Sequence, residues 1–334
     1  MYTNENLNSA VEEGIFTENS VEEFRAYIAQ ESETKGVDEE NFKLVTGFND
    51  IFVVIASLLL LISASWITSS VSETLSAIVV AGLAWGLSEF FVRKRKMSFP
   101  AIVLLLAFVV SVFRIFYTPS VFIDSASEVT GFILASALAG LATLLHWKRF
   151  AVPITIAIGM GTVTAFVVAL IVKIVPNVED YIAFPLFFMG LGIFALAMYW
   201  DMRDRKRITS DSDVAFWLHL LASPLMIHSI FLGLGIFDKD ISSLALVIVV
   251  FSYLLLSSIS LIIDRRALMV SSLLYVLYSL NKLFSTYGFE GYGLAIGGVL
   301  IGGGLLFLTA FWTNSRALLL KHLPQSIRKR VPLS

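Results

Sequence analysis

Residues 93–117 read RKRKMSFPAIVLLLAFVVSVFRIFY: four consecutive cations, then a long apolar run that contains one charge, Arg114. A helix rises about 1.5 Å per residue, so roughly 20 apolar residues cross the hydrocarbon core of a bilayer. Cations at the end of such a segment mark its cytoplasmic side. The stretch therefore predicts a transmembrane helix that begins in the cytoplasm.

The composition of the whole chain agrees with this interpretation. Of its 334 residues, 57% are hydrophobic and 15% are charged, whereas soluble domains carry about 25% charged residues. The absence of cysteine excludes disulfides, thiolate metal sites and cysteine nucleophiles. The sequence contains no His/Glu metal motif, so we assign no catalytic residue and no metal ligand. An enzyme is the class that the sequence favours least, and nothing in it indicates a nucleic-acid partner.

Ten segments have the length and hydropathy of a membrane span. We therefore expect an all-α, polytopic membrane bundle of about ten transmembrane helices. The expected spans are residues 51–68, 74–92, 100–117, 129–147, 151–174, 181–200, 214–236, 241–263, 267–285 and 292–313.

The direction of the spans follows from the positions of lysine and arginine. Seventeen of these cations fall in alternate connections and in the C-terminal tail, whereas the five opposite connections contain one, Lys239. This asymmetry predicts that both termini face the cytoplasm of a bacterial inner membrane. The seventeen are Arg93, Lys94, Arg95, Lys96, Lys148, Arg149, Arg203, Arg205, Lys206, Arg207, Arg265, Arg266, Arg316, Lys321, Arg328, Lys329 and Arg330.

Two polar segments flank the expected bundle of residues 50–314. Residues 1–49 hold eleven Asp or Glu and three cations, a net charge of −8. Capping-box patterns at Ser9 and Ser20, with Gly14 as a stop, predict a short helical hairpin there. It is either a solvated cap or a regulatory, partner-binding element. Residues 315–334 form a basic amphipathic tail, and we expect it and the basic loops to attract anionic lipids.

His219 and His228 lie in one expected span, VAFWLHLLASPLMIHS (214–229), with Pro224 between them. Nine helical residues amount to about half a turn of net rotation and about 13 Å of rise, so the two rings cannot share one metal. Each ring needs a polar partner inside the membrane. A structural hydrogen bond and a ligand-binding role both remain open.

Further candidate ligand-binding residues are polar groups within the spans. Three cations, Arg114, Lys173 and Lys282, lie toward the outer ends of their segments. Their side chains either extend to the membrane interface, pair with acidic residues of the outer loops, or form a vestibule that attracts anions. Two polar stripes repeat the offsets 0, 4, 7 and 11, so each occupies one helical face. Either the stripes pack against each other or they line a hydrated path. The stripes are Tyr253, Ser257, Ser260 and Asp264 in one span, and Ser271, Tyr275, Tyr278 and Lys282 in the next.

Three stretches, NFKLVTGFNDIF (41–52), SDVAFWLHLLASPLMIHS (212–229) and DRRALMVSSLLYVLYSL (264–280), resemble a group of uncharacterised bacterial multi-pass inner-membrane proteins. The N-terminal helical element is similar to that of DUF2157-type membrane proteins. The resemblance implies a membrane bundle but does not identify an activity, a cofactor or a partner protein. From the residues we expect a transport-like or small-ligand-binding protein. The alternative is a structural, sensory or assembly factor that acts through its cytoplasmic appendages, and a homo-oligomer is compatible with both.

Overall fold

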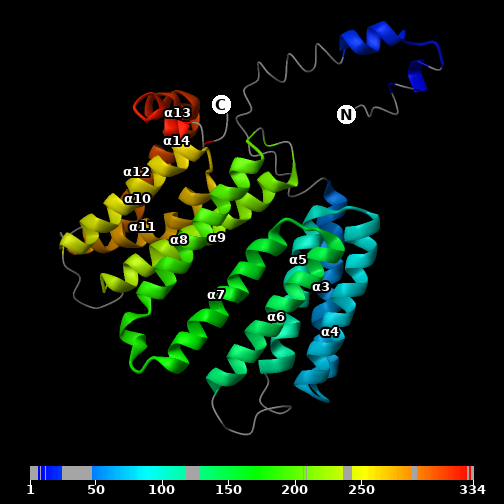
Figure 1. The fold of residues 1–334 in the computed structure, drawn as a ribbon, viewed down its shortest axis with the longest axis horizontal. Helices are drawn as coiled ribbons and strands as arrows, with labels where there is room; N and C mark the ends of the chain where they lie inside the picture. The colour runs from blue at the N-terminus through cyan, green and yellow to red at the C-terminus, as the bar shows by residue number, and fades with distance from the viewer. Residues whose placement is uncertain are drawn as a thin grey trace. The chain divides into compact units, whose positions relative to one another are not determined.

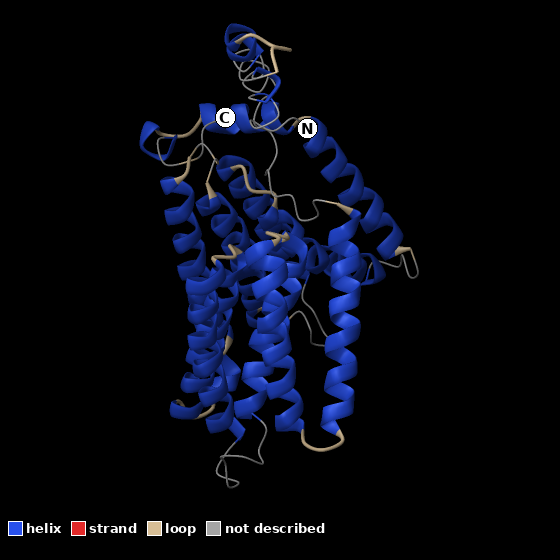
Figure 2. Cartoon of the chain, turned by 90° about the vertical axis from the view of Figure 1, so that its right-hand side faces the viewer, coloured by secondary structure: helices blue, strands red, loops and turns tan. Residues whose placement is uncertain are grey.

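A computed structural model describes residues 7, 9–11, 13–24, 47–117, 128–205, 207, 209–235, 243–286, 292–328 and 331. The chain divides into two compact units, one within residues 1–41 and one comprising residues 42–333. Among the described residues, the regular elements are all helical (Figure 2). The all-α class expected from the sequence is confirmed.

The described part of the larger unit contains ten long helices, and each coincides with one expected span (Figure 1). They are α3 (Phe48–Ser69), α4 (Glu73–Ser88), α5 (Ser98–Tyr117), α6 (Glu128–Phe150), α7 (Ile154–Ile174), α8 (Ala183–Arg203), α9 (Ser210–Gly233), α10 (Ser243–Ile263), α11 (Ala267–Thr286) and α12 (Gly293–Ala310). Shorter elements are the π-helix η1 (Glu89–Lys94), the 3-10 helix η2 (Val178–Tyr181), α13 (Trp312–Lys321) and α14 (Gln325–Arg328).

Seven helices, α3 to α9 with η1 continuing α4, are long and apolar enough to cross a membrane in the part of the chain that the structure describes. The α12–α13 pair supplies an eighth span if its 78° bend is counted within one crossing. The apolar part of α10, Val247–Ile263, is shorter. The protein is thus a multi-pass helical membrane protein with seven to eight spans by this measure.

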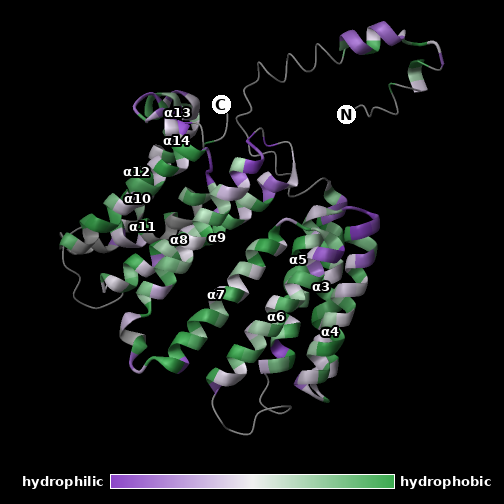
Figure 3. Cartoon of the chain, in the orientation of Figure 1, coloured by the Kyte–Doolittle hydropathy of each residue, from purple (hydrophilic) through white to green (hydrophobic). Residues whose placement is uncertain are grey.

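The outer surface of the larger unit is as apolar as its interior. Leu59, Phe188 and Phe251 are each more than 60% exposed in the isolated protein. Figure 3 shows hydrophobic residues along the helices and hydrophilic ones gathered at helix ends. Lipid tails provide the solvent that such a surface needs, so the bundle contacts the bilayer directly.

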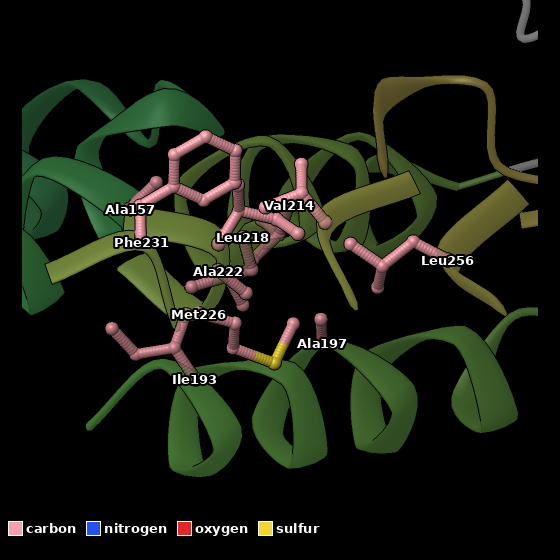
Figure 4. Close-up of a cluster of buried hydrophobic side chains, with 11 residues drawn as sticks. Ala157, Ile193, Ala197, Val214, Leu218, Ala222, Met226, Phe231 and Leu256 are labelled. Atoms are coloured by element: carbon pink, nitrogen blue, oxygen red, sulfur yellow. The ribbon is translucent and has the colours of Figure 1, made fainter. Parts of the chain in front are cut away.

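Successive helices from α3 to α7 pack on their neighbours, and α8 packs most extensively on α9. A buried cluster lies at the α8–α9 interface, where Ala222 and Met226 of α9 lie against Ile193 and Ala197 of α8 (Figure 4). The α7 helix contacts both α8 and α9, and α11 contacts α9. The α8–α9 pair therefore stands between the earlier and the later helices.

The connections that carry the cations meet at one end of the larger unit. Arg93, Ala151 and Asp213 line one pocket, which brings together the α4–α5 connection, the α6–α7 connection and the start of α9. Arg265, in the α10–α11 turn, bonds to Asp201 at the end of α8. The segments that the charge count placed on one side are thus neighbours in space.

Two details of the sequence interpretation are corrected. The last expected span, 292–313, is too long, because α12 ends at Ala310 and the chain turns there. Trp312, directly after this turn, is 2% exposed, because its ring is packed into the protein. In the N-terminal unit the second capping box is formed by Thr17 and Ser20 instead of Ser20 and Glu23: Thr17 N donates to Ser20 Oγ (2.9 Å) and Ser20 N to Thr17 Oγ1 (3.2 Å).

The close approach of α8 and α9 depends on Gly190. A Cβ at this position would lie 2.9 Å from Met226 Cγ and 3.0 Å from the Met226 backbone nitrogen. Gly192, in the same GLG sequence, has nothing within 4 Å of such an atom. A methyl group at Gly190 would therefore push the two helices apart, whereas one at Gly192 enters open space.

We predict that Gly190→Ala lowers the stability of the purified protein by about 1–3 kcal/mol, because the added methyl overpacks the interface. Gly192→Ala should be neutral or slightly stabilising, since alanine favours the helix. Thermal unfolding in detergent, followed by intrinsic fluorescence, measures both. Equal midpoints for the two variants would contradict the close packing at Gly190.

Candidate functional site

Buried charges gather where α8, α9 and the α10–α11 turn meet. Asp201, at the end of α8, accepts from Arg265: Nε lies 3.2 Å from Oδ1, and Nη2 also contacts this oxygen. His219 Nε2 lies 2.9 Å from the other carboxylate oxygen of Asp201. Arg265 Nη2 also donates to the backbone oxygen and to Oγ of Ser212, both at 3.1 Å. All four residues are buried. We call this set the buried ion cluster.

A second group of bonds continues from this cluster toward α13. Arg207 Nη1 donates to Asp264 Oδ2 (2.9 Å), and its Nη2 donates to the Asp264 backbone oxygen (2.6 Å). The Trp312 indole Nε1 donates to Asp264 Oδ1 (2.6 Å). The Arg266 guanidinium lies 4.9 Å from the centre of the Trp312 ring. Asp264 thus joins the α8–α9 connection to the bend between α12 and α13.

Local sequence places these side chains at helix ends, where a charge costs least. Asp201 follows the apolar run of α8, and Arg265 follows that of α10. Asp264 and Arg207 adopt left-handed backbone conformations, with φ of 58° and 54°. These two residues end or connect helices instead of continuing them. Each helix therefore delivers its charge to the same end of the unit, where opposite charges compensate each other.

We predict that Asp201→Asn lowers stability by about 3–5 kcal/mol, because it leaves the Arg265 charge buried without compensation. The matched control is Asp211→Asn. Asp211 pairs with Arg203 at 3.2 Å, but the two side chains are 25% and 49% exposed. Loss of such a pair costs less than about 1 kcal/mol. Thermal unfolding of both variants tests this, and a similar small shift in both would show that the cluster adds little to the stability of the fold.

A groove of about 440 Å³ lies among α10, α11 and α12. Its hydroxyl groups come from Tyr253, Ser257 and Ser258 of α10, and most of its remaining lining is aliphatic. Gly304 lines the α12 side. Tyr253 and Ser257 belong to the first polar stripe identified in the sequence. We call this feature the α10–α12 groove.

A buried apolar cluster, which we call the plug, lies between the groove and Asp264. Leu261, Met269 and Trp312 form a buried cluster, and Leu305 and Leu308 pack against it. Leu261 lines the groove, and Trp312 bonds to Asp264. The polar stripe of α10 therefore begins in the groove at Tyr253, passes the plug, and ends among the buried charges at Asp264.

The described candidate residues have different surroundings. His219 is in the buried ion cluster, and His228 is half-buried farther along α9. Arg114 pairs with Glu73, and Lys173 Nζ donates to Thr130 Oγ1 at 2.9 Å. Tyr278 of α11 is 42% exposed. The side chains of Tyr275 and Lys282 lie outside the described residues, and so does any vestibule that includes Lys282.

His146 is a second buried histidine with a different environment. Its ring packs against Trp85, Phe108 and Phe150, with ring centres 4.5–6.1 Å apart. Neither ring nitrogen has a hydrogen-bond partner among the described residues. It lies beside the α6–α7 interface, where a pocket of about 430 Å³ is lined by Thr143, Thr155 and Gly159. Aromatic packing accounts for the position of this ring.

Sequence reasoning did not identify Asp201 and Arg265 as site residues. Asp201 directly follows the sixth expected span, 181–200, and was not considered, and Arg265 was counted only as a cation that indicates topology. Asp201 lies 64 residues before Arg265, so no local spacing connects them. The available signal was a carboxylate directly after the apolar run of the sixth expected span. Such a charge either reaches the interface or requires a buried partner.

Comparison with protein-family models gives no match, and neither does comparison with curated proteins. The interpretation of the site therefore depends on its geometry.

Proposed function

We propose that the chain is a transport-like or small-ligand-binding protein that holds a small amphipathic molecule in the α10–α12 groove. The supporting observation is a groove lined by hydroxyls that ends at an apolar plug, with a buried ion cluster beyond it. The volume of the groove is about 440 Å³, within the range of about 300–1,000 Å³ that small-molecule sites have. The aliphatic lining suits an apolar body, and the hydroxyls of Tyr253 and Ser258 suit one or two polar groups.

The buried ion cluster would keep the end beyond the plug closed. Ion pairs and packed interfaces have discrete arrangements, so a closed end of this kind opens by exchanging partners instead of by gradual stretching. Asp201 accepts from both His219 and Arg265, and a group with two partners can release one and keep the other. A change of partner at Asp201 is therefore the movement that we assign to this site.

We further propose ten spans, with both termini in the cytoplasm of a bacterial inner membrane. Ten helices at the ten expected places support the count, and the clustering of cation-bearing connections at one end supports the direction. On this topology α10 and α11 also cross the bilayer. The charged end with Asp201 and Arg265 then faces the cytoplasm.

The topology can be tested by cysteine labelling, because the natural chain has no cysteine. We predict that single cysteines replacing Arg95, Arg266 and Ser326 react with an impermeant maleimide only after the inner membrane is permeabilised. Cysteines replacing Ser70, Asn177 and Tyr292 should react in spheroplasts. Labelling of Arg266→Cys and Tyr292→Cys from the same side would show that α11 does not cross.

The groove can be tested in the same way. We predict that Ser257→Cys reacts with a charged thiol reagent at least tenfold faster than Leu255→Cys, because the reactive thiolate needs water. Leu255 is two residues away on α10 and 52% exposed on the apolar surface, so it serves as the lipid-facing control. Equal and slow reaction at both positions would show a dry groove and would reject the ligand-binding proposal.

The alternative function, a sensory or assembly role, is favoured by the N-terminal unit. Leu7, Phe16, Val21 and Phe24 line a pocket of about 300 Å³ there, and Ile15 is 65% exposed. An apolar surface on a small acidic unit suits the binding of another protein. This function would depend on residues 1–45, whereas ligand binding in the α10–α12 groove would not.

We therefore predict that deletion of residues 1–45 leaves thiol reactivity at Ser257→Cys and the thermal unfolding midpoint unchanged. Whole-cell crosslinking with the full-length and shortened chains provides the comparison for partner binding. Loss of a specific crosslinked partner upon deletion, with no other change, would favour the sensory or assembly role over transport.

A further inference from the structure

The pocket lined by Arg93, Ala151 and Asp213 has a volume of about 370 Å³ and lies where the α4–α5 connection meets the α6–α7 connection and the start of α9. Arg93 and Lys96 contribute positive charge to its lining, and Asp213 of α9 contributes negative charge. Much of the remaining lining is apolar and includes Met97, Ile154 and Trp217. It therefore offers both signs of charge next to hydrocarbon-like walls.

The two cations are placed by an irregular backbone. The end of the α4 span is the π-helical turn η1, and Lys96 follows it with a φ of 53°. Glu89 accepts from Arg149 Nε at 2.6 Å and from Arg93 Nη1 at 3.3 Å. This pairing holds the guanidinium end of Arg93 beside Glu89, while 54% of the Arg93 side chain stays exposed. Arg93 is therefore accessible to a ligand in the pocket that it lines.

Asp213 differs from the acids near it. Asp211 pairs with Arg203, and Asp204 accepts from the Thr209 hydroxyl at 2.7 Å. Asp213 is half-buried in the pocket wall and forms no ion pair in the described part of the chain, although Arg265 attracts it electrostatically. A half-buried carboxylate beside apolar lining residues favours a cationic ligand.

We propose that this pocket binds the headgroup of a phospholipid with a primary ammonium, the phosphatidylethanolamine class. The phosphodiester lies against Arg93 and Lys96, since guanidinium and ammonium groups bind phosphate oxygens by charge-assisted hydrogen bonds. The ammonium group donates to Asp213. The acyl chains leave along the apolar wall toward the bilayer.

The combination of charges selects this lipid class over the other common headgroups. A phosphatidylglycerol headgroup brings a phosphate but no cation for Asp213. A phosphatidylcholine headgroup brings a quaternary ammonium, which has no N–H to donate to a carboxylate. The position also fits, because the pocket lies at the end with the cation-bearing connections, where headgroups meet the protein. The proposal does not depend on a ligand in the α10–α12 groove.

The test is native mass spectrometry of the full-length protein in detergent, titrated separately with dioleoyl-phosphatidylethanolamine, -phosphatidylglycerol and -phosphatidylcholine. We expect one high-affinity phosphatidylethanolamine, bound roughly tenfold more tightly than either other lipid, the ratio that one extra ion pair in a half-buried site can supply. Asp213→Asn should remove this preference and leave phosphate-dependent binding in place. Asp211→Asn is the matched control and should keep the preference.

A second variant tests the phosphate contact without changing the backbone. Lys96→Gly removes the cation, and glycine adopts the left-handed conformation of this residue without strain. It should weaken all three lipids by roughly tenfold, the effect of losing one charge-assisted contact. Lys94→Ala, which removes a cation outside the pocket lining, should not. The proposal is overturned if phosphatidylglycerol binds best, if the three lipids bind alike, or if Asp213→Asn and Lys96→Gly behave as the wild type does.

Discussion

The cost of placing an unpaired polar group in hydrocarbon determines the form of this protein. Every backbone amide within the bilayer needs a partner, so the long apolar segments are helices. Charged side chains cost more, so most of them lie at helix ends and in connections. Three of the charges that remain buried, Asp201, Arg265 and Asp264, are paired with groups of complementary charge or hydrogen-bonding capacity. The apolar surface and the buried ion cluster are two consequences of the same penalty.

This penalty also explains how much of the fold could be predicted. Hydropathy is a property of each segment, and all ten expected segments are helices with ends close to the expected ones. The bend after Ala310 was missed because it accompanies a tertiary contact, the hydrogen bond from Trp312 to Asp264. In the same way, the two glycines of GLG (190–192) are equivalent in the sequence. Only the packing of α9 on α8 distinguishes Gly190 from Gly192.

The candidate site was less predictable than the fold. His219 was identified because a buried imidazole requires a polar partner, and the structure supplies that partner as Asp201. The spacing of residues in the sequence could pair neither Asp201 nor Arg265 with His219, since the three residues come from different helices and turns. The polar stripe of α10 was identified by its period. Its division into groove residues and buried-charge residues depends on the plug of Leu261, Met269 and Trp312.

The tight contact at Gly190 also affects how the bundle can move. The backbone of α9 at Met226 lies close to Gly190 of α8, so a shift of α8 against α9 would require this contact to change. The α8 and α9 helices contact α7 less extensively than they contact each other. The boundary beside α7 is therefore where helices α3 to α7 can rotate most readily against the helices that follow them. The pocket of Arg93, Lys96 and Asp213 spans this boundary, with Asp213 and Trp217 on one side and the α4–α7 segments on the other. A molecule bound in this pocket would contact both groups of helices, and its presence would determine how freely they move relative to each other.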